Sequence, residues 1–88
     1  MNNTELIQAL SLEKIAMYLT SKGWKKKKEA EGIASIWRYA SNGREVSILL
    51  PIDKEFGDFE IKMEDLILLI AEVESRPQSE ILNTLSGL

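Results

Sequence analysis

The feature that most constrains the fold is an Asn-Gly pair, Asn42-Gly43, which separates two stretches of β-forming residues. Residues 33–40 are rich in β-branched and aromatic side chains, and residues 45–50 return to an alternating pattern. An Asn-Gly pair favours a type I′ turn, because both central residues of that turn need positive φ angles. The sequence therefore predicts a β-hairpin whose turn is Ser41-Asn42-Gly43-Arg44.

This turn also predicts the register of the hairpin. With Asn42 and Gly43 central, Trp37 lies opposite Ile48. One face then carries an aromatic and aliphatic set, made of Trp37, Tyr39, Val46, Ile48 and Leu50. The other face carries polar residues and one apolar pair, namely Arg38, Glu45, Ser47, Ile36 and Leu49. A slip of one residue would exchange the two sets, so the agreement between turn and pattern supports this register.

Helical signals precede the hairpin. Residues 4–10 allow a first helical turn or two with Thr4 as N-cap. Ser11 is a better N-cap, and it predicts a helix from Leu12 to Lys22 that ends before Gly23. The short link to the hairpin, residues 24–28, then predicts a first strand, with a turn at residues 29–32. Regular alternation would place Trp24, Lys26 and Lys28 on one side of that strand, and Lys25 and Lys27 on the other.

A long helix is predicted after the hairpin. Pro51 ends the third strand, because proline cannot donate to a ladder, and Asp58 can cap the next helix. Its apolar stripe predicts a helix over Phe59–Glu74 and consists of Phe59, Met63, Leu66, Ile67, Ile70 and Val73. A second apolar group, Ile61, Leu68 and Leu69, lies off that stripe. Ser75 and Gln78 have the spacing of a capping box, so a short last helix is expected to fold back and cover part of the second group.

The chain is therefore expected to be a single α+β domain over residues 1–88, with the order helix, three-stranded antiparallel meander, long helix, short C-terminal helix. It contains neither cysteine nor histidine, which removes thiolate chemistry, the commonest general base and the commonest metal ligand. No signal peptide and no membrane-spanning run is recognisable, so a soluble, cytoplasmic protein is expected. The sequence predicts no cofactor, no metal site and no enzymatic activity.

Charge is unevenly distributed along the chain. Residues 1–50 hold eight basic and five acidic residues, a net charge of +3, whereas residues 51–88 hold three basic and nine acidic residues, a net charge of −6. Such asymmetry bears on partners rather than on fold. One hypothesis is contact with nucleic-acid phosphates, with Trp24 and Trp37 as stacking platforms beside Lys25, Lys26, Lys27, Lys28, Arg38 and Arg44. The simpler interpretation, favoured by the negative net charge, is a solvated edge strand and two core tryptophans.

Acidic and apolar residues suggest two further hypotheses. The acidic set Asp53, Glu55, Asp58 and Glu60 lacks the spacing of a calcium loop, so a cap and solvated loop residues are favoured over a cation site. Some apolar residues exceed what one small core requires, and such patches indicate protein contacts or self-association. They form the candidate protein interface, made of Ile36, Leu49, Ile61, Leu68 and Leu69. The alternative is that the last helix covers the helical residues of this set, while the sheet pair is ordinary exposed surface.

Two resemblances bear on these hypotheses. Residues 19–24, ending in Gly23-Trp24, look like the segment that closes the first helix of HicA-type mRNA interferase toxins, and Gly32 sits close to the glycine of their Gly-Ser-His motif. The order of elements over roughly residues 12–70 resembles these toxins and the double-stranded RNA-binding fold. Ile33 and Ala34 follow Gly32, so the toxins' catalytic histidine is missing and their nuclease activity does not carry over. The helix after Asp58 is acidic, whereas the RNA-binding fold has a basic helix there.

The segments Ile48-Leu49-Leu50-Pro51-Ile52-Asp53, Asp58-Phe59 and Ala71-Glu72-Val73-Glu74-Ser75-Arg76 also resemble a family of small uncharacterised bacterial domains. That resemblance covers about the last two thirds of the chain and implies the fold and a bacterial or phage origin. Taken together, the sequence favours a non-enzymatic interaction module that binds itself as a homodimer or binds another protein. A nucleic-acid-binding domain that uses the basic strand and its tryptophans is the alternative.

Overall fold

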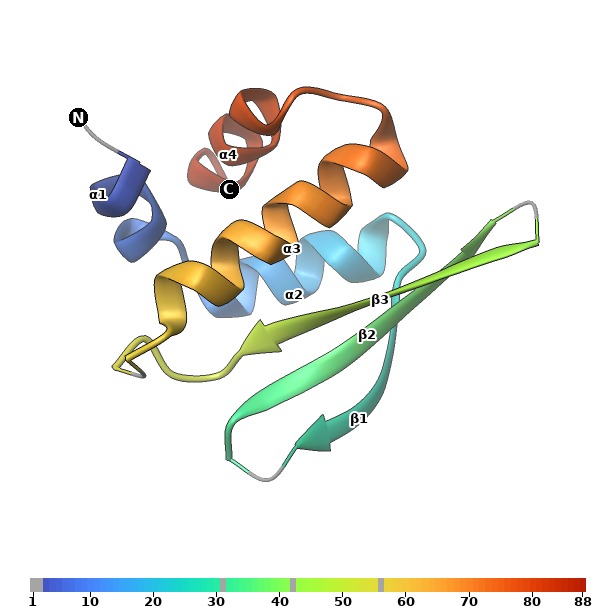
Figure 1. The fold of residues 1–88 in the computed structure, drawn as a ribbon, viewed down its shortest axis with the longest axis horizontal. Coiled ribbons are helices and arrows are strands. Elements are labelled where there is room, and N and C mark those ends of the chain that lie inside the picture. The colour runs from blue at the N-terminus through green and yellow to red at the C-terminus, as the bar shows by residue number, and fades with distance from the viewer. Residues whose placement is uncertain (1–2, 31, 42, 56) are drawn as a thin grey trace.

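The computed structural model describes residues 3–30, 32–41, 43–55 and 57–88. In chain order these residues form α1 (Asn3–Ala9), α2 (Leu12–Ser21), β1 (Lys25–Ala30), β2 (Ala34–Ser41), β3 (Arg44–Pro51), α3 (Phe59–Glu74) and α4 (Gln78–Ser86) (Figure 1). The predicted α+β fold and the predicted order of its elements are confirmed. The early helical signal is a separate helix, but Thr4 lies inside α1 rather than capping it.

The three strands form one antiparallel sheet in the order β1-β2-β3. Trp37 pairs with Ile48, Tyr39 with Val46, and Ser35 with Leu50, so the predicted hairpin register is confirmed. Gly43 has a φ angle of 81°, as the second central residue of the predicted turn requires. Asn42, the other half of that prediction, lies outside the described residues.

Strand β1 departs from the expected alternation. Lys26 pairs with Trp37, but the next pair along the ladder is Lys28 with Ile36, so Lys27 is the extra residue of a β-bulge. The bulge turns Lys28 toward the face of Ile36, while Lys26 stays on the face of Trp37. The predicted placement of Lys26 and Lys28 on one side is therefore wrong. The predicted turn at residues 29–32 is also too early, because β1 continues through Ala30.

Helix α2 begins at the predicted Leu12 and ends at Ser21, one residue before the predicted end, with Lys22 as its C-cap. Ser11 is its N-cap, and the Ser11 hydroxyl accepts a hydrogen bond from the backbone N–H of Lys14 at 3.3 Å. Gly23 follows the helix with a φ angle of 96°. The N–H of Trp24 then donates to the carbonyl of Leu19 at 2.9 Å, which is the longer hydrogen bond of a Schellman motif. This turn delivers Trp24 into the core at the start of the sheet.

Helix α3 spans the predicted residues, and its predicted apolar stripe is buried except for Val73, which is half-buried. Asp58 occupies the N-cap position without a side-chain capping bond. The predicted capping box is wrong. Ser75 ends α3 in the left-handed region at φ 54° and ψ 46°, and α4 begins after Pro77. Proline disfavours a helical conformation at the preceding Arg76, so the chain cannot enter α4 directly from Ser75.

The helices lie on one side of the sheet (Figure 1). Helix α3 packs on β3, α2 contacts β1 and β3, and α4 folds back on α3 while also contacting α1 and α2. The core fills the space between these helices and the inner sheet face, which carries Trp37, Ile48 and Leu50. Among the residues that the structure describes, no helix lies on the outer sheet face, so this face remains in contact with solvent (Figure 1).

Candidate interaction surfaces

The first candidate surface is the outer face of the sheet. Ile36 and Leu49 are register partners at its centre, where Ile36 is half-buried and Leu49 is 41 % exposed. Lys28 lies opposite Ile36 on the neighbouring strand. The next pair along the two strands whose side chains lie on the outer face is Lys25 with Arg38. Residues that are paired across strands share a face, so these five residues form one continuous surface, which we call the open sheet face: Lys25, Lys28, Ile36, Arg38 and Leu49.

The cations of the open sheet face are exposed and unpaired. Among the described residues, Lys25, Lys28 and Arg38 are in no ion pair. Lys26 differs, because it lies on the inner side of β1 and pairs there with Glu29. The hydrogen bond and charge of Lys26 lower the pKa of the Glu29 carboxyl group. The positive charge available to a partner is therefore concentrated on the outer side.

The second candidate surface is the solvent side of α3. Ile61 is 62 % exposed and Leu68 is 41 % exposed, and their separation of seven residues places them on one helix face. Glu64, Asp65 and Glu72 are exposed on that same face by helical spacing. We call these residues the acidic helix face: Ile61, Glu64, Asp65, Leu68 and Glu72. It combines two aliphatic side chains with three negative charges.

Leu69 does not belong to this surface. It is half-buried and packs against the core, so the candidate interface predicted from sequence divides in two. Helix α4 buries Ile81, Leu82 and Leu85 in the core, and Ile61 and Leu68 remain exposed. Helix α4 folds back on α3 as predicted, but it leaves these two residues exposed, so the alternative in which it covers all three helical residues is wrong.

Other exposed apolar side chains were not singled out from the sequence. Met17 is 67 % exposed on α2, Ile33 is 60 % exposed and Ile52 is 46 % exposed. Ile33 and Ile52 extend the hairpin by one pair, since the N–H of Ile52 donates to the carbonyl of Ile33 at 3.2 Å. Continuing the predicted register by that pair would have placed both residues on the inner face, so the register alone does not predict their exposure.

The nucleic-acid hypothesis loses its stacking residues. Trp24 is 2 % exposed and Trp37 is 5 % exposed, so neither ring offers a free face to a base. Trp24 instead packs against Tyr39, with ring centroids 5.3 Å apart. The hypothesis that the two tryptophans are stacking platforms is wrong, and the favoured interpretation of two core tryptophans is confirmed. The cations remain exposed but divide among surfaces: Lys26 lies on the inner side of β1, and Arg44 lies at the far end of the hairpin.

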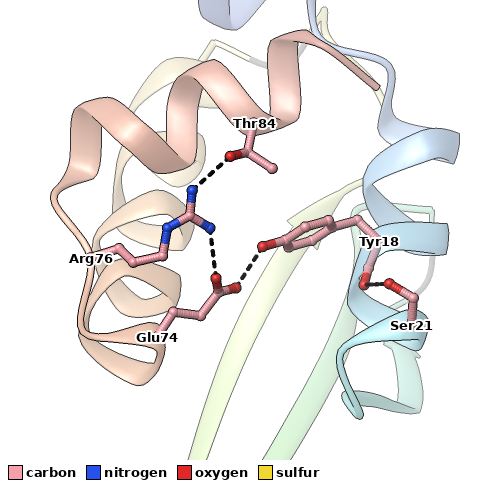
Figure 2. A network of polar contacts seen from close by, with 5 residues as sticks. All are labelled: Tyr18, Ser21, Glu74, Arg76 and Thr84. Atoms are coloured by element: carbon pink, nitrogen blue, oxygen red, sulfur yellow. Dashed lines mark hydrogen bonds and ion pairs between the residues drawn. The ribbon is translucent and has the colours of Figure 1, made fainter.

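A polar network joins α2, α3 and α4 on the helical side of the sheet (Figure 2). The Tyr18 hydroxyl donates to Glu74 Oε2 at 2.6 Å, and Arg76 Nη1 donates to Glu74 Oε1 at 2.9 Å. Arg76 Nη2 also donates to Thr84 Oγ1 at 2.9 Å. Burial, together with the charge of the Glu74 carboxylate that accepts the hydrogen bond of its hydroxyl, raises the pKa of Tyr18 to about 12. Each member has a partner within the protein, so the network acts as a clamp between α2, α3 and α4.

A cleft of about 230 Å³ opens between the hairpin tip and the C-terminal end of α3. Its walls carry one cation and one acid among hydroxyl and aliphatic groups, namely Tyr39, Ser41, Arg44, Val46, Glu72, Val73 and Ser75. The chain has no histidine to activate a serine and no cysteine to act as a nucleophile itself. The cleft thus lacks the paired groups that acyl transfer or metal-assisted hydrolysis would need.

Within the acidic set, Asp53 stabilises the backbone of its own loop, whereas Asp58 lies at the N-cap of α3 without a capping hydrogen bond. Asp53 Oδ1 accepts a hydrogen bond from the N–H of Glu55 at 2.9 Å, which shapes the loop between β3 and α3. Among the residues that the structure describes, no three acidic, histidine or cysteine side chains gather closely enough to hold a metal ion. Within the same residues, no helix combines the length and the apolar character that crossing a membrane requires.

Comparison of the chain with known protein families, with curated proteins and with solved structures finds no match. The resemblances to the HicA-type toxins, to the double-stranded RNA-binding fold and to the small bacterial domains therefore stay predictions. The candidate surfaces have to be interpreted from their own chemistry.

Proposed function

We propose that the protein is a non-enzymatic interaction module that associates with further copies of itself, and that the open sheet face is one of its contact surfaces. The observation that carries the proposal is the bare outer face of the sheet, with Leu49 exposed at its centre among unpaired cations. Apolar centres with polar rims are typical of protein interfaces. The resemblances of the sequence favour a bacterial or phage origin, and a cytoplasmic setting belongs to the same proposal.

The three exposed cations of the open sheet face also support a second candidate function, binding of nucleic-acid phosphates. Lys25, Lys28 and Arg38 would supply such contacts without help from the buried tryptophans. The apolar centre of the same face favours a protein partner, because Ile36 and Leu49 can pack against apolar side chains but gain nothing from contact with charged phosphates. A Lys25→Glu/Lys28→Glu variant would abolish salt-sensitive RNA or DNA binding if the second function holds.

The proposal is tested by the solution mass of the wild-type chain over a concentration series that reaches the high micromolar range. We expect association that weakens in a Leu49→Glu variant, because this change places a charge at the apolar centre. Met17→Lys is the matched control, since Met17 is an exposed apolar residue on α2, away from the sheet. Circular dichroism and urea unfolding confirm that each variant is folded. A wild-type chain that stays monomeric throughout the series overturns the proposal.

A further inference from the structure

The open sheet face and the acidic helix face are complementary in charge and alike in their apolar content. The first carries Lys25, Lys28 and Arg38 around the Ile36 and Leu49 pair, and these three cations outweigh Glu45, which lies on the same face toward the hairpin tip. The second carries Glu64, Asp65 and Glu72 around Ile61 and Leu68. Resting on the proposed self-association, we infer that the occupant of the open sheet face is the acidic helix face of a second copy. The contact is therefore head-to-tail.

The two surfaces point in different directions. Helix α3 packs its buried stripe toward β3, so its solvent side faces away from the sheet. The open sheet face lies on the opposite side of that same sheet. One copy can consequently offer both surfaces at once without folding back on itself, which a head-to-tail contact requires.

The dimensions of the surfaces also match. Ile61 and Leu68 lie two helical turns apart, roughly 10 Å along α3. Three strands at a spacing of about 4.8 Å make the open sheet face about 10 Å wide between its outer strands. The protein already packs the other stripe of α3 on the inner face of its own sheet. The intermolecular contact repeats that helix-on-sheet arrangement on the outer face.

Contacts between two identical surfaces are disfavoured by charge. Two open sheet faces would bring Lys25, Lys28 and Arg38 against the same cations. Two acidic helix faces would likewise bring Glu64, Asp65 and Glu72 together. Like charges juxtaposed across an interface are costly, whereas opposite charges steer encounter and set the register. The charge distribution therefore selects the mixed contact over either closed, two-fold dimer.

A head-to-tail contact has a consequence for assembly. Each copy that joins leaves one open sheet face and one acidic helix face unused at the ends, so growth continues into a filament unless a ring closes. The oligomer size should rise with protein concentration. It should fall with added salt, because exposed charges beyond a Debye length of about 8 Å at physiological ionic strength are screened.

The decisive experiment uses two variants that each disable one surface. Leu49→Glu places a negative charge on the open sheet face, and Leu68→Lys places a positive charge on the acidic helix face. We expect each variant alone to be monomeric by analytical ultracentrifugation. Mixing them should restore association, because the intact helix face of the first meets the intact sheet face of the second. Met17→Lys, outside both surfaces, should associate like the wild type.

The outcomes separate this inference from the proposed function. If the wild type associates and Leu68→Lys associates equally well, α3 is not the occupant; the head-to-tail inference fails and self-association stands. If the wild type is monomeric at every concentration, both fail. Glu64→Lys/Asp65→Lys provides a second disabled helix face that removes no apolar side chain, so a folding defect in Leu68→Lys leaves the test intact. Restored association in either mixture supports the inference.

Discussion

The two faces of the sheet are built from alternate residues of the same strands, yet they have opposite properties. On β3, Ile48 is 2 % exposed and its neighbour Leu49 is 41 % exposed. Alternation places them on opposite faces, but it does not say which face becomes the core. The helices decide that, because they all lie on the side of Ile48 (Figure 1). The apolar pattern of a strand thus predicts which residues share a face, and the position of the helices decides which face is buried.

Polar groups differ between the faces in the same way. On the inner face, Trp37 Nε1 donates to Ser35 Oγ at 2.8 Å, and the Ser35 hydroxyl donates to the Leu50 carbonyl at 3.5 Å. Among the described residues, no buried side-chain nitrogen or oxygen lacks a partner. On the outer face, Lys25, Lys28 and Arg38 form no ion pair among the described residues, although the exposed Glu45 lies on the same face. The inner face is therefore complete within the monomer, whereas the outer face retains charge for a partner.

The largest expected effect comes from a matched pair of truncations on β3. Ile48→Ala should lower the free energy of unfolding by about 2–5 kcal/mol, because it leaves a cavity in the core. Leu49→Ala should change it by no more than about 0.5 kcal/mol, since its side chain lies at the surface. Urea unfolding of both variants below the concentration of self-association provides the measurement. Equal losses would show that the outer face also contributes to the core.

The helices above the inner face are held together by packing and by the clamp in Figure 2, and Tyr18→Phe separates the two contributions. The variant keeps the ring but removes the hydrogen bond to Glu74. We expect the free energy of unfolding to fall by about 1.5–2 kcal/mol at neutral pH, at the low end of the range for a hydrogen bond to a charged group. Thr20→Val, which removes an exposed hydroxyl of α2, is the control. A loss as large as that of Ile48→Ala would contradict the expected order.

The same variant gives a pH signature. The pKa of Tyr18 is raised to about 12 from an ordinary value of 10.0. The folded state therefore holds this proton more tightly, so the stabilisation is fully present below pH 10 and is lost between pH 10 and about 12. The difference in unfolding free energy between wild type and Tyr18→Phe should shrink across that interval. A constant difference would show that the hydroxyl does not titrate as the clamp requires.

Local signals account for the parts of the structure that the sequence predicts well. The Asn-Gly turn sets the hairpin register, and the apolar stripe of α3 marks both its length and its buried face. No local pattern predicts the bulge at Lys27, because four successive lysines show the same pattern in a regular strand and in a bulged one. The clamp is also invisible in the sequence, since Tyr18 and Glu74 are 56 residues apart and follow no shared period.

The candidate surfaces were only partly predictable for a related reason. Periodicity shows that Ile61, Leu68 and Leu69 lie off the buried stripe, but not where α4 will settle. The structure leaves the first two exposed and packs Leu69 against the core. The position of Lys28 on the outer face could not be predicted either, because it depends on the bulge that brings Lys28 beside Ile36. The packing of α4 and the bulge in β1 therefore decide which of these side chains are exposed, and periodicity alone does not.

The smallest expected effect tests the backbone of the covering helices at Ser75. This residue has a φ angle of 54°, where the N–H of Arg76 donates to the carbonyl of Ala71 at 3.0 Å to close the turn after α3. A side chain with a Cβ atom is strained in that conformation, and glycine is not. Ser75→Gly should therefore raise the free energy of unfolding by about 0.5–1 kcal/mol, after the entropic cost of glycine in the unfolded chain.

The control for this prediction makes the same chemical change in a helix. Ser79 is exposed in the first turn of α4, where glycine is a poorer helix former than serine, so Ser79→Gly should lower the free energy of unfolding by about 0.5 kcal/mol. Opposite signs in thermal or urea unfolding would assign the gain at Ser75 to its left-handed backbone. If both variants lose stability, Ser75 contributes through its side chain instead. The turn that carries Arg76 back toward Glu74 would then owe its stability to contacts rather than to relief of strain.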